Sequence, residues 1–154
     1  VDWILKKKVC GVANGKAEFG PRALGNRSLL GDVRYNIKRT VNRIKRRQNF
    51  RPFAPAILSE YADEYFEGPM NRYMQFVAQA KHDYSSVTHV DNSARVQLVT
   101  PECKTVLRPI LEEYYERTGV PMLLNTSLNI KGQPIVDNWQ HAMDFQKMYG
   151  VKVF

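Results

Sequence analysis

The clearest hydrophobic pattern along the chain is helical and spans residues 103–118. Its apolar side chains recur every three or four residues and therefore share one face: Val106, Leu107, Ile110, Leu111 and Tyr114. Gly119 follows directly, and glycine is common just past a helix end because it accepts a left-handed backbone. The pattern predicts a helix over 103–118, a buried strand over 120–125 and a final helix over 139–149.

A second helical pattern covers residues 33–47. Four apolar residues recur there at helical spacing: Val33, Ile37, Val41 and Ile44. Asp32 precedes them, and aspartate is a favoured N-cap residue. Pro52 and Pro55 then exclude a regular helix through residues 50–55. The segment therefore predicts a capped helix over 33–47, followed by a rigid proline turn.

The remaining segments alternate between short strands and short helices. Strands are expected at 9–13, 56–58, 73–80, 94–99 and 151–154, and helices at 2–8 and 60–67. Residues 14–32 are punctuated by glycine and predict an ordered loop region that holds a short strand. This alternation predicts an α/β fold with helices packed on a twisted sheet, in a single domain over residues 1–154.

The composition is that of a globular chain. It has 154 residues, of which 44% are hydrophobic and 25% charged. No apolar run approaches the ~20 residues that cross a membrane. The chain begins at Val1 without an initiator methionine, which suggests a piece of a longer protein. Cys10 and Cys103 form no spacing motif, so we expect reduced thiols and a cytoplasmic location.

The net charge of +8 is the first observation that bears on function, because it favours an anionic partner such as nucleic acid, a membrane surface or a phosphorylated small molecule. Residues 38–51 contain no acidic residue and seven basic ones: Lys38, Arg39, Arg43, Lys45, Arg46, Arg47 and Arg51. Three interpretations are open, namely a solvated helix face, a nucleic-acid groove and a small phosphate pocket at the helix end. Arg51 favours the pocket, since it is fixed between Phe50 and Pro52.

The loop over residues 18–28 carries two arginines, Arg22 and Arg27, in a backbone shaped by glycine and proline. Glycine lets a backbone approach a ligand closely, and a guanidinium group binds phosphate through two parallel hydrogen bonds. The alternative is a tight turn in which one arginine pairs with Glu18. The loop is not a Walker loop, because no Gly-Lys-Ser/Thr closes it.

A run of small polar residues, 125–129, follows the strand expected at 120–125. In open α/β sheets ligands gather at the carboxyl ends of strands, which makes Asn125, Ser127 and Asn129 candidate binding residues. Ser127 lacks the Gly-x-Ser-x-Gly pattern of a serine nucleophile. No metal site is predicted, since no metal-ligand spacing relates the three histidines: His82, His89 and His141.

Four segments resemble, in order, the C-terminal domain of nodulation-type and antibiotic-tailoring O-carbamoyltransferases. They are AEFGPRALGNRSLL, KRRQNFRPFAPAI, SARVQLV and PMLLNTSLNIKGQPIV, and the resemblance covers roughly residues 9–136. That family domain is similar to the YrdC fold, whose mark is Lys-x-Arg followed much later by Ser-x-Asn. The matching residues here are Lys45-Arg46-Arg47 and Ser127-Leu128-Asn129. The resemblance therefore implies a YrdC-like twisted mixed sheet with helices packed on it.

The resemblance also implies an activity. Domains of this kind take carbamoyl phosphate and ATP, with Mg²⁺, and form a carbamoyl-adenylate, which a separate N-terminal domain uses to carbamoylate a substrate hydroxyl. By motif position Lys45 and Arg47 are the expected catalytic residues, because fixed cations stabilise phosphoryl charge. The expected substrate- and nucleotide-binding residues are Arg22, Arg51, Arg95, Asn125, Ser127 and Asn129.

This sequence departs from the family pattern at two positions. Gln48 and Gln133 stand where the family usually has glutamate, which makes a pocket there more positive. Two other hypotheses remain beside the enzyme domain. One is a nucleic-acid-binding module that uses residues 38–51, although that helix lacks interleaved aromatic residues. The other is a degenerate domain that keeps the fold and contributes only an interface.

Overall fold

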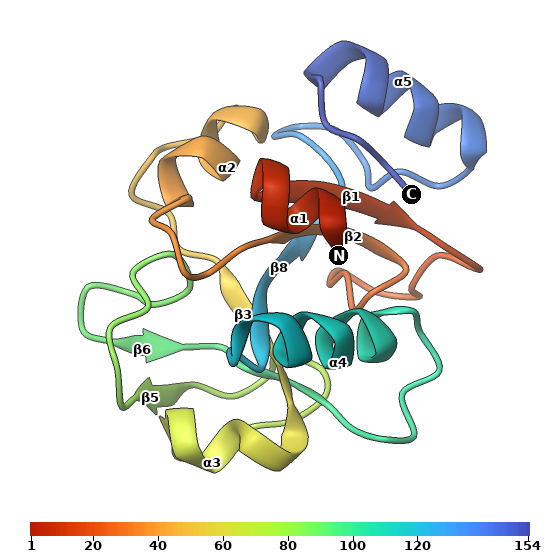
Figure 1. Cartoon of the computed structure of the whole chain (residues 1–154). Coiled ribbons are helices and arrows are strands. Elements are labelled where there is room, and N and C mark those ends of the chain that lie inside the picture. The colour runs from red at the N-terminus through yellow and green to blue at the C-terminus, as the bar shows by residue number, and fades with distance from the viewer.

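The computed structural model describes all residues, 1–154, and is built on a five-stranded mixed sheet (Figure 1). The strands, in spatial order, are β1 (Val9–Ala13), β2 (Arg27–Gly31), β8 (Met122–Ser127), β3 (Ala54–Leu58) and β7 (Gln97–Val99). All neighbours are antiparallel except β3 and β7, which run parallel. A second sheet has three short strands: β4 (Phe66–Glu67), β5 (Ala78–Ala80) and β6 (Ser93–Ala94). The expected mixed sheet with helices packed on it is confirmed.

Helices cover both faces of the five-stranded sheet. They are α1 (Asp2–Lys7), α2 (Lys38–Ile44), α3 (Ala62–Tyr65) preceded by a 3₁₀ turn (Ser59–Tyr61), α4 (Leu107–Thr118) and α5 (Trp139–Tyr149). Adjacent residues of a strand point to opposite faces. Accordingly, Leu123 packs in an apolar cluster with α1 and α4, and Leu124 packs in a larger one with α2, α5 and the small sheet. None of the helices is long and apolar enough to span a bilayer.

Helix α4 confirms the clearest sequence pattern but is shorter than predicted. Leu107, Leu111 and Tyr114 are fully buried along one face, and Gly119 ends the helix with φ 70°. The four residues expected before it form a turn instead, and the Thr105 hydroxyl accepts the amide hydrogen of Leu107 at 3.3 Å. The hydroxyl satisfies an amide that has no partner within the helix.

The helix predicted over 33–47 is wrong in its first third, because α2 begins only at Lys38. Asp32 is not its N-cap. The Asp32 carboxylate is fully buried and accepts hydrogen bonds from Arg34 Nη2 at 2.8 Å and from the Tyr114 hydroxyl at 2.7 Å. It also accepts the Arg34 amide at 3.1 Å, which holds this stretch in turns. At the other end Arg46 adopts φ 51°, a left-handed conformation that stops the helix.

Several strands differ from their predicted limits. The strand expected at 94–99 is two strands, because the chain passes from the small sheet (β6) to the large one (β7) at Arg95. Strand β3 begins two residues early and includes Pro55, which it tolerates because β7 pairs only with Ala56 and beyond.

The other differences are simple shortenings. The strand expected at 73–80 survives only as β5, the helix at 60–67 ends at Tyr65, and residues 151–154 form a single bridge between Val153 and Gly11. Cys10 and Cys103 are free thiols, as expected.

Candidate functional site

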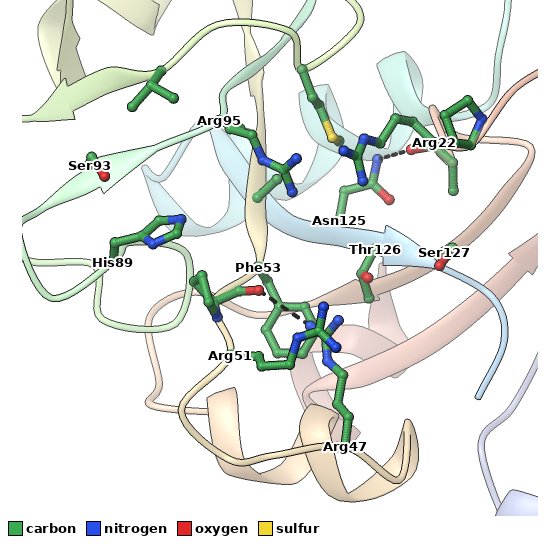
Figure 2. Close-up of a pocket in the computed structure, with 16 residues that line it drawn as sticks. Arg22, Arg47, Arg51, Phe53, His89, Ser93, Arg95, Asn125, Thr126 and Ser127 are labelled. Atoms are coloured by element: carbon green, nitrogen blue, oxygen red, sulfur yellow. Dashed lines mark hydrogen bonds between the residues drawn. The ribbon is translucent and has the colours of Figure 1, made fainter. Parts of the chain in front are cut away.

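A cavity of about 480 Å³ opens beside the carboxyl-terminal half of β8, between the large and the small sheet (Figure 2). Its volume is typical of small-molecule sites, which fall at roughly 300–1,000 Å³. Four arginines from three separate segments of the chain line it: Arg22, Arg47, Arg51 and Arg95. No aspartate or glutamate is among its 16 lining residues. The site therefore presents cations without internal counter-charges.

Arg47 is held rigidly at the cavity wall. Its Nε donates to Asn42 Oδ1 at 2.6 Å, its Nη2 donates to the Pro52 carbonyl at 3.3 Å, and its guanidinium lies 4.3 Å from the centre of the Phe53 ring. Burial, and then the nearby charge of Arg51, lowers the pKa of Arg47 to about 10. An arginine that keeps its charge in such surroundings favours any anion that enters the cavity.

Asn42 organises the turn that carries these two arginines. It is fully buried, and its Nδ2 donates to the carbonyls of Asn49 at 3.1 Å and Arg51 at 2.9 Å. Sequence reasoning missed this residue. The available signal was an asparagine beside Val41 in the apolar stripe of the helix, where a buried amide needs partners.

Arg22 and Arg95 face Arg47 and Arg51 across the cavity (Figure 2). Arg22 lies on a loop that is fixed by Glu18, whose Oε1 accepts the amide hydrogens of Leu24 and Asn26 at 2.7 Å each. Burial, and then the charge of Arg22, lowers the pKa of Arg95. The pairing of an arginine with Glu18 that was open from the sequence does not form: Glu18 Oε1 accepts the two backbone amides, and Oε2 is buried without a partner.

Arg27, the second arginine of the same loop, is structural. It is 6% exposed and donates to the carbonyls of Asn14, Gly15, Asn26 and Asp137 at distances of 2.7–3.3 Å. Its charge is thus shared among backbone oxygens beneath the loop. Of the two arginines that the sequence offered for phosphate, only Arg22 lines the cavity.

Lys45 joins the two motifs that the resemblance singled out. Its ammonium contacts the Ser127 carbonyl and donates to Ser127 Oγ at 3.3 Å and to Asn129 Oδ1 at 2.9 Å. Burial, followed by repulsion from Arg47 and Arg51, lowers the pKa of Lys45 to about 7. Lys45 is buried, with only 4% of its surface exposed. Neither Lys45 nor Asn129 lines the cavity; both lie behind Ser127, which does.

Asn125 lines the cavity with an amide whose orientation is fixed. Its Nδ2 donates to the Ala23 carbonyl at 3.1 Å and to Gln97 Oε1 at 2.7 Å. Gln97 Nε2 in turn donates to the Leu24 carbonyl at 3.1 Å. Asn125 Oδ1 is buried and has no hydrogen-bond partner. Sequence reasoning gave no role to Gln97, because nothing local marks a glutamine in a short strand.

The cavity also includes residues that the sequence did not single out, and it omits Gln48 and Gln133 as well as Arg27, Lys45 and Asn129. His89, Ser93 and Thr126 line it. The sequence gave His89 no role, because no neighbouring residue signalled its position. Gln48 and Gln133 are exposed and lie outside the lining, so their replacement of glutamate leaves the cavity wall unchanged. No group of three or more His, Cys, Asp or Glu residues lies close enough together to hold a metal ion.

Comparison with known proteins shows the family of this chain. The family model described as Carbamoyltransferase C-terminus matches residues 1–154. Nodulation protein NolNO of Sinorhizobium fredii is 43% identical over 152 residues, which is 92% of this chain and 22% of that protein. Nodulation protein NolO of Bradyrhizobium diazoefficiens is 40% identical over 152 residues, which is 92% of this chain and 28% of that protein. The chain thus spans about a quarter of the length of these relatives, and it belongs to the carbamoyltransferase C-terminus family.

Proposed function

We propose that this chain is the domain of a carbamoyltransferase that binds carbamoyl phosphate and ATP and forms a carbamoyl-adenylate. A separate domain of a longer protein then transfers the carbamoyl group to a substrate hydroxyl. The observation that carries the proposal is the set of four arginines around one cavity that has no carboxylate. Both substrates are phosphate esters or anhydrides, and arginine binds such groups through paired hydrogen bonds.

The reaction needs positive charge on both sides of a phosphoryl group. An oxygen of the carbamoyl group bonds to the α-phosphorus of ATP, and pyrophosphate leaves. Atom balance also requires one water, which releases the original phosphate of carbamoyl phosphate. Charge develops on the phosphoryl oxygens and on the leaving pyrophosphate, so fixed cations lower the barrier without a covalent nucleophile. Arg47 and Arg51 on one wall, with Arg22 and Arg95 on the other, meet that requirement.

Lys45 acts from behind this wall. Its ammonium holds Ser127 and Asn129 and adds positive potential to the cavity without lining it. In this proposal Lys45 fixes the Ser127 hydroxyl for a hydrogen bond to the substrate. A bound anion also favours the protonated form of Lys45, whose pKa is about 7 in the ligand-free chain.

The cavity suits the phosphates of ATP better than a metal ion held by the protein. Mg²⁺ prefers carboxylate oxygens, and none lines the cavity. In this proposal Mg²⁺ therefore arrives on ATP, where it neutralises part of the triphosphate charge. The chain's own residues bind the remaining oxygens and orient the reacting groups.

The test is calorimetric titration of the 154-residue chain with ATP and with carbamoyl phosphate, with and without Mg²⁺. Saturable binding in the micromolar range is expected for the wild-type chain. Arg95→Ala should weaken it by about 1.5–3 kcal/mol, roughly 10- to 150-fold, the range for a charge-assisted hydrogen bond.

Arg43→Ala is the matched control, because Arg43 lies exposed on α2 and does not line the cavity. It should leave both affinities unchanged. A folded wild-type chain that binds neither ligand, or an Arg95→Ala chain with wild-type affinity, would contradict the proposal. Tight, strongly salt-dependent binding of RNA or DNA instead would favour the nucleic-acid hypothesis.

A further inference from the structure

A chain of hydrogen bonds runs from the Arg22 loop through two side-chain amides to the cavity. It begins at the Leu24 carbonyl, which accepts from Gln97 Nε2 at 3.1 Å. Gln97 Oε1 then accepts from Asn125 Nδ2 at 2.7 Å, and the Ala23 carbonyl accepts from the same nitrogen at 3.1 Å. Both ends at the loop are backbone carbonyls, which can only accept.

These contacts determine which atom of Asn125 remains free. A carbonyl at Leu24 requires the nitrogen of Gln97 to face it, so the Gln97 oxygen faces Asn125. Asn125 must then direct its nitrogen at Gln97 and Ala23, which uses both of its hydrogens. The remaining atom is Oδ1, an obligate acceptor. Turning either amide over would oppose two acceptors or two donors.

The free oxygen of Asn125 is buried at the cavity wall and has no partner (Figure 2). Asn125 is 1% exposed and Gln97 is 3% exposed, so solvent does little for either amide. A buried acceptor without a donor is unfavourable, and a ligand that supplies the donor removes that cost. The four arginines of the cavity donate hydrogen bonds and bind an anion, whereas Asn125 Oδ1 accepts one. Together they fit a ligand that carries an N–H group close to an anion.

We propose that Asn125, oriented by Gln97, is the specificity-determining residue that selects an acyl phosphate bearing an amide NH₂ over one bearing a methyl group. This inference rests on the proposed function. Carbamoyl phosphate and acetyl phosphate have nearly the same shape and the same phosphate. They differ at the group that would meet Asn125, where NH₂ donates a hydrogen bond and CH₃ does not. A site built around a hydrogen bond rejects the analogue that cannot make it.

Gln97 is a positioning residue in this arrangement, since it acts through Asn125. It lies on β7, and its second contact, to Leu24, ties the same amide pair to the loop that carries Arg22. Without Gln97, Asn125 keeps the Ala23 carbonyl as its only partner. The Asn125 amide is then free to turn over, and the cavity no longer always meets its accepting oxygen.

The test compares two phosphonates that resist hydrolysis and differ only in the selected group. Phosphonoacetamide carries the NH₂, and acetonylphosphonate carries a methyl in its place. The wild-type chain should bind phosphonoacetamide at least about tenfold more tightly. Asn125→Leu, which keeps the approximate size but removes the acceptor, should bring the ratio of the two dissociation constants to about one, with little change for acetonylphosphonate.

Gln97→Met provides a second variant in case Asn125→Leu fails to fold, and its ratio should fall between those of the wild type and Asn125→Leu. Gln79→Met, on exposed Gln79 of β5, is the matched control and should keep the wild-type ratio. Equal affinity of the wild-type chain for the two phosphonates would overturn the inference and leave the proposed function standing. An unchanged ratio in both Asn125→Leu and Gln97→Met would do the same. Failure of the wild-type chain to bind either phosphonate, ATP or carbamoyl phosphate would overturn both.

Discussion

The arginines on the two sides of the large sheet differ in whether a carboxylate pairs with them. On the α4 side, Arg34 pairs with Asp32 at 2.8 Å, and Arg108 pairs with Glu60 and Glu112. These carboxylates raise the pKa values of Arg34 and Arg108. In the cavity the arginine pKa values shift the other way. Burial and neighbouring arginines lower the pKa values of Arg47 and Arg95.

The difference separates two uses of the same residue. Paired arginines are neutralised locally, so they contribute to the fold and have little attraction left for a ligand. Cavity arginines repel one another in the empty site, and an incoming phosphate relieves that repulsion. A protein that keeps like charges together without counter-ions sacrifices some stability there, as is usual at functional sites. Substitutions in the two regions should therefore have opposite effects on stability and binding.

The largest expected effect comes from breaking the paired side. Asp32→Asn removes the buried charge that Arg34 and Tyr114 share, and should lower the free energy of unfolding by about 3 kcal/mol. Urea denaturation followed by circular dichroism measures this loss. The folded fraction should bind ATP with wild-type affinity, because Asp32 does not line the cavity. A loss below about 1 kcal/mol would mean that this cluster is not a main support of the fold.

Removing a cavity arginine should act in the opposite way. Arg51→Ala should weaken ATP binding by about 2 kcal/mol, the range for a charge-assisted hydrogen bond, and leave the free energy of unfolding unchanged or slightly higher. The exposed Arg39 of α2 supplies the control Arg39→Ala, which should change neither quantity. If Arg51→Ala instead destabilised the chain as strongly as Asp32→Asn, the two classes of arginine would not be distinct.

The smallest effect is a pH dependence that Lys45 confers on binding. Its pKa is about 7 without ligand, and a bound anion raises it by stabilising the charged form. Binding therefore takes up a proton, and the affinity for ATP should fall as the pH rises from 7 to 9. Titrations in buffers of different ionisation enthalpy report this proton uptake. Lys45→Met should flatten the profile, and an equally steep profile in that variant would assign the proton to another group.

The same group predicts the opposite slope for stability. Lys45 has a pKa of about 7 when folded, below its usual value of about 10.4 in an unfolded chain. Between these values the unfolded chain binds more protons, so the contribution of Lys45 to the free energy of unfolding rises with pH. If affinity falls and stability rises with pH, and both dependences are lost in Lys45→Met, then Lys45 belongs with the cavity arginines as a buried cation that has no carboxylate partner.

The sequence determined much of the framework of this protein. Apolar spacing located α4, because a period of 3.6 residues states directly which face is buried, and a continuous apolar run located the buried strand β8. The spacing could not show that residues 33–37 are held in turns, since their partner Tyr114 lies far along the chain. Lys45 and Ser127 were selected from separate motifs, and the fold brings them into contact. Their proposed roles in binding remain predictions.

Only the tertiary structure decided which polar side chains have hydrogen-bond partners within the protein. Arg22 and Arg27 stand five residues apart and looked equivalent in the sequence. The fold gives Arg27 the carbonyl of Asp137, 110 residues away, and leaves Arg22 facing a cavity. Gln97 and Asn125 likewise acquire their orientation from the carbonyls of Leu24 and Ala23, in a loop more than 70 residues earlier in the chain. Periodicity is local and can be seen in a sequence, whereas hydrogen-bond satisfaction depends on distant segments that meet only when the chain folds.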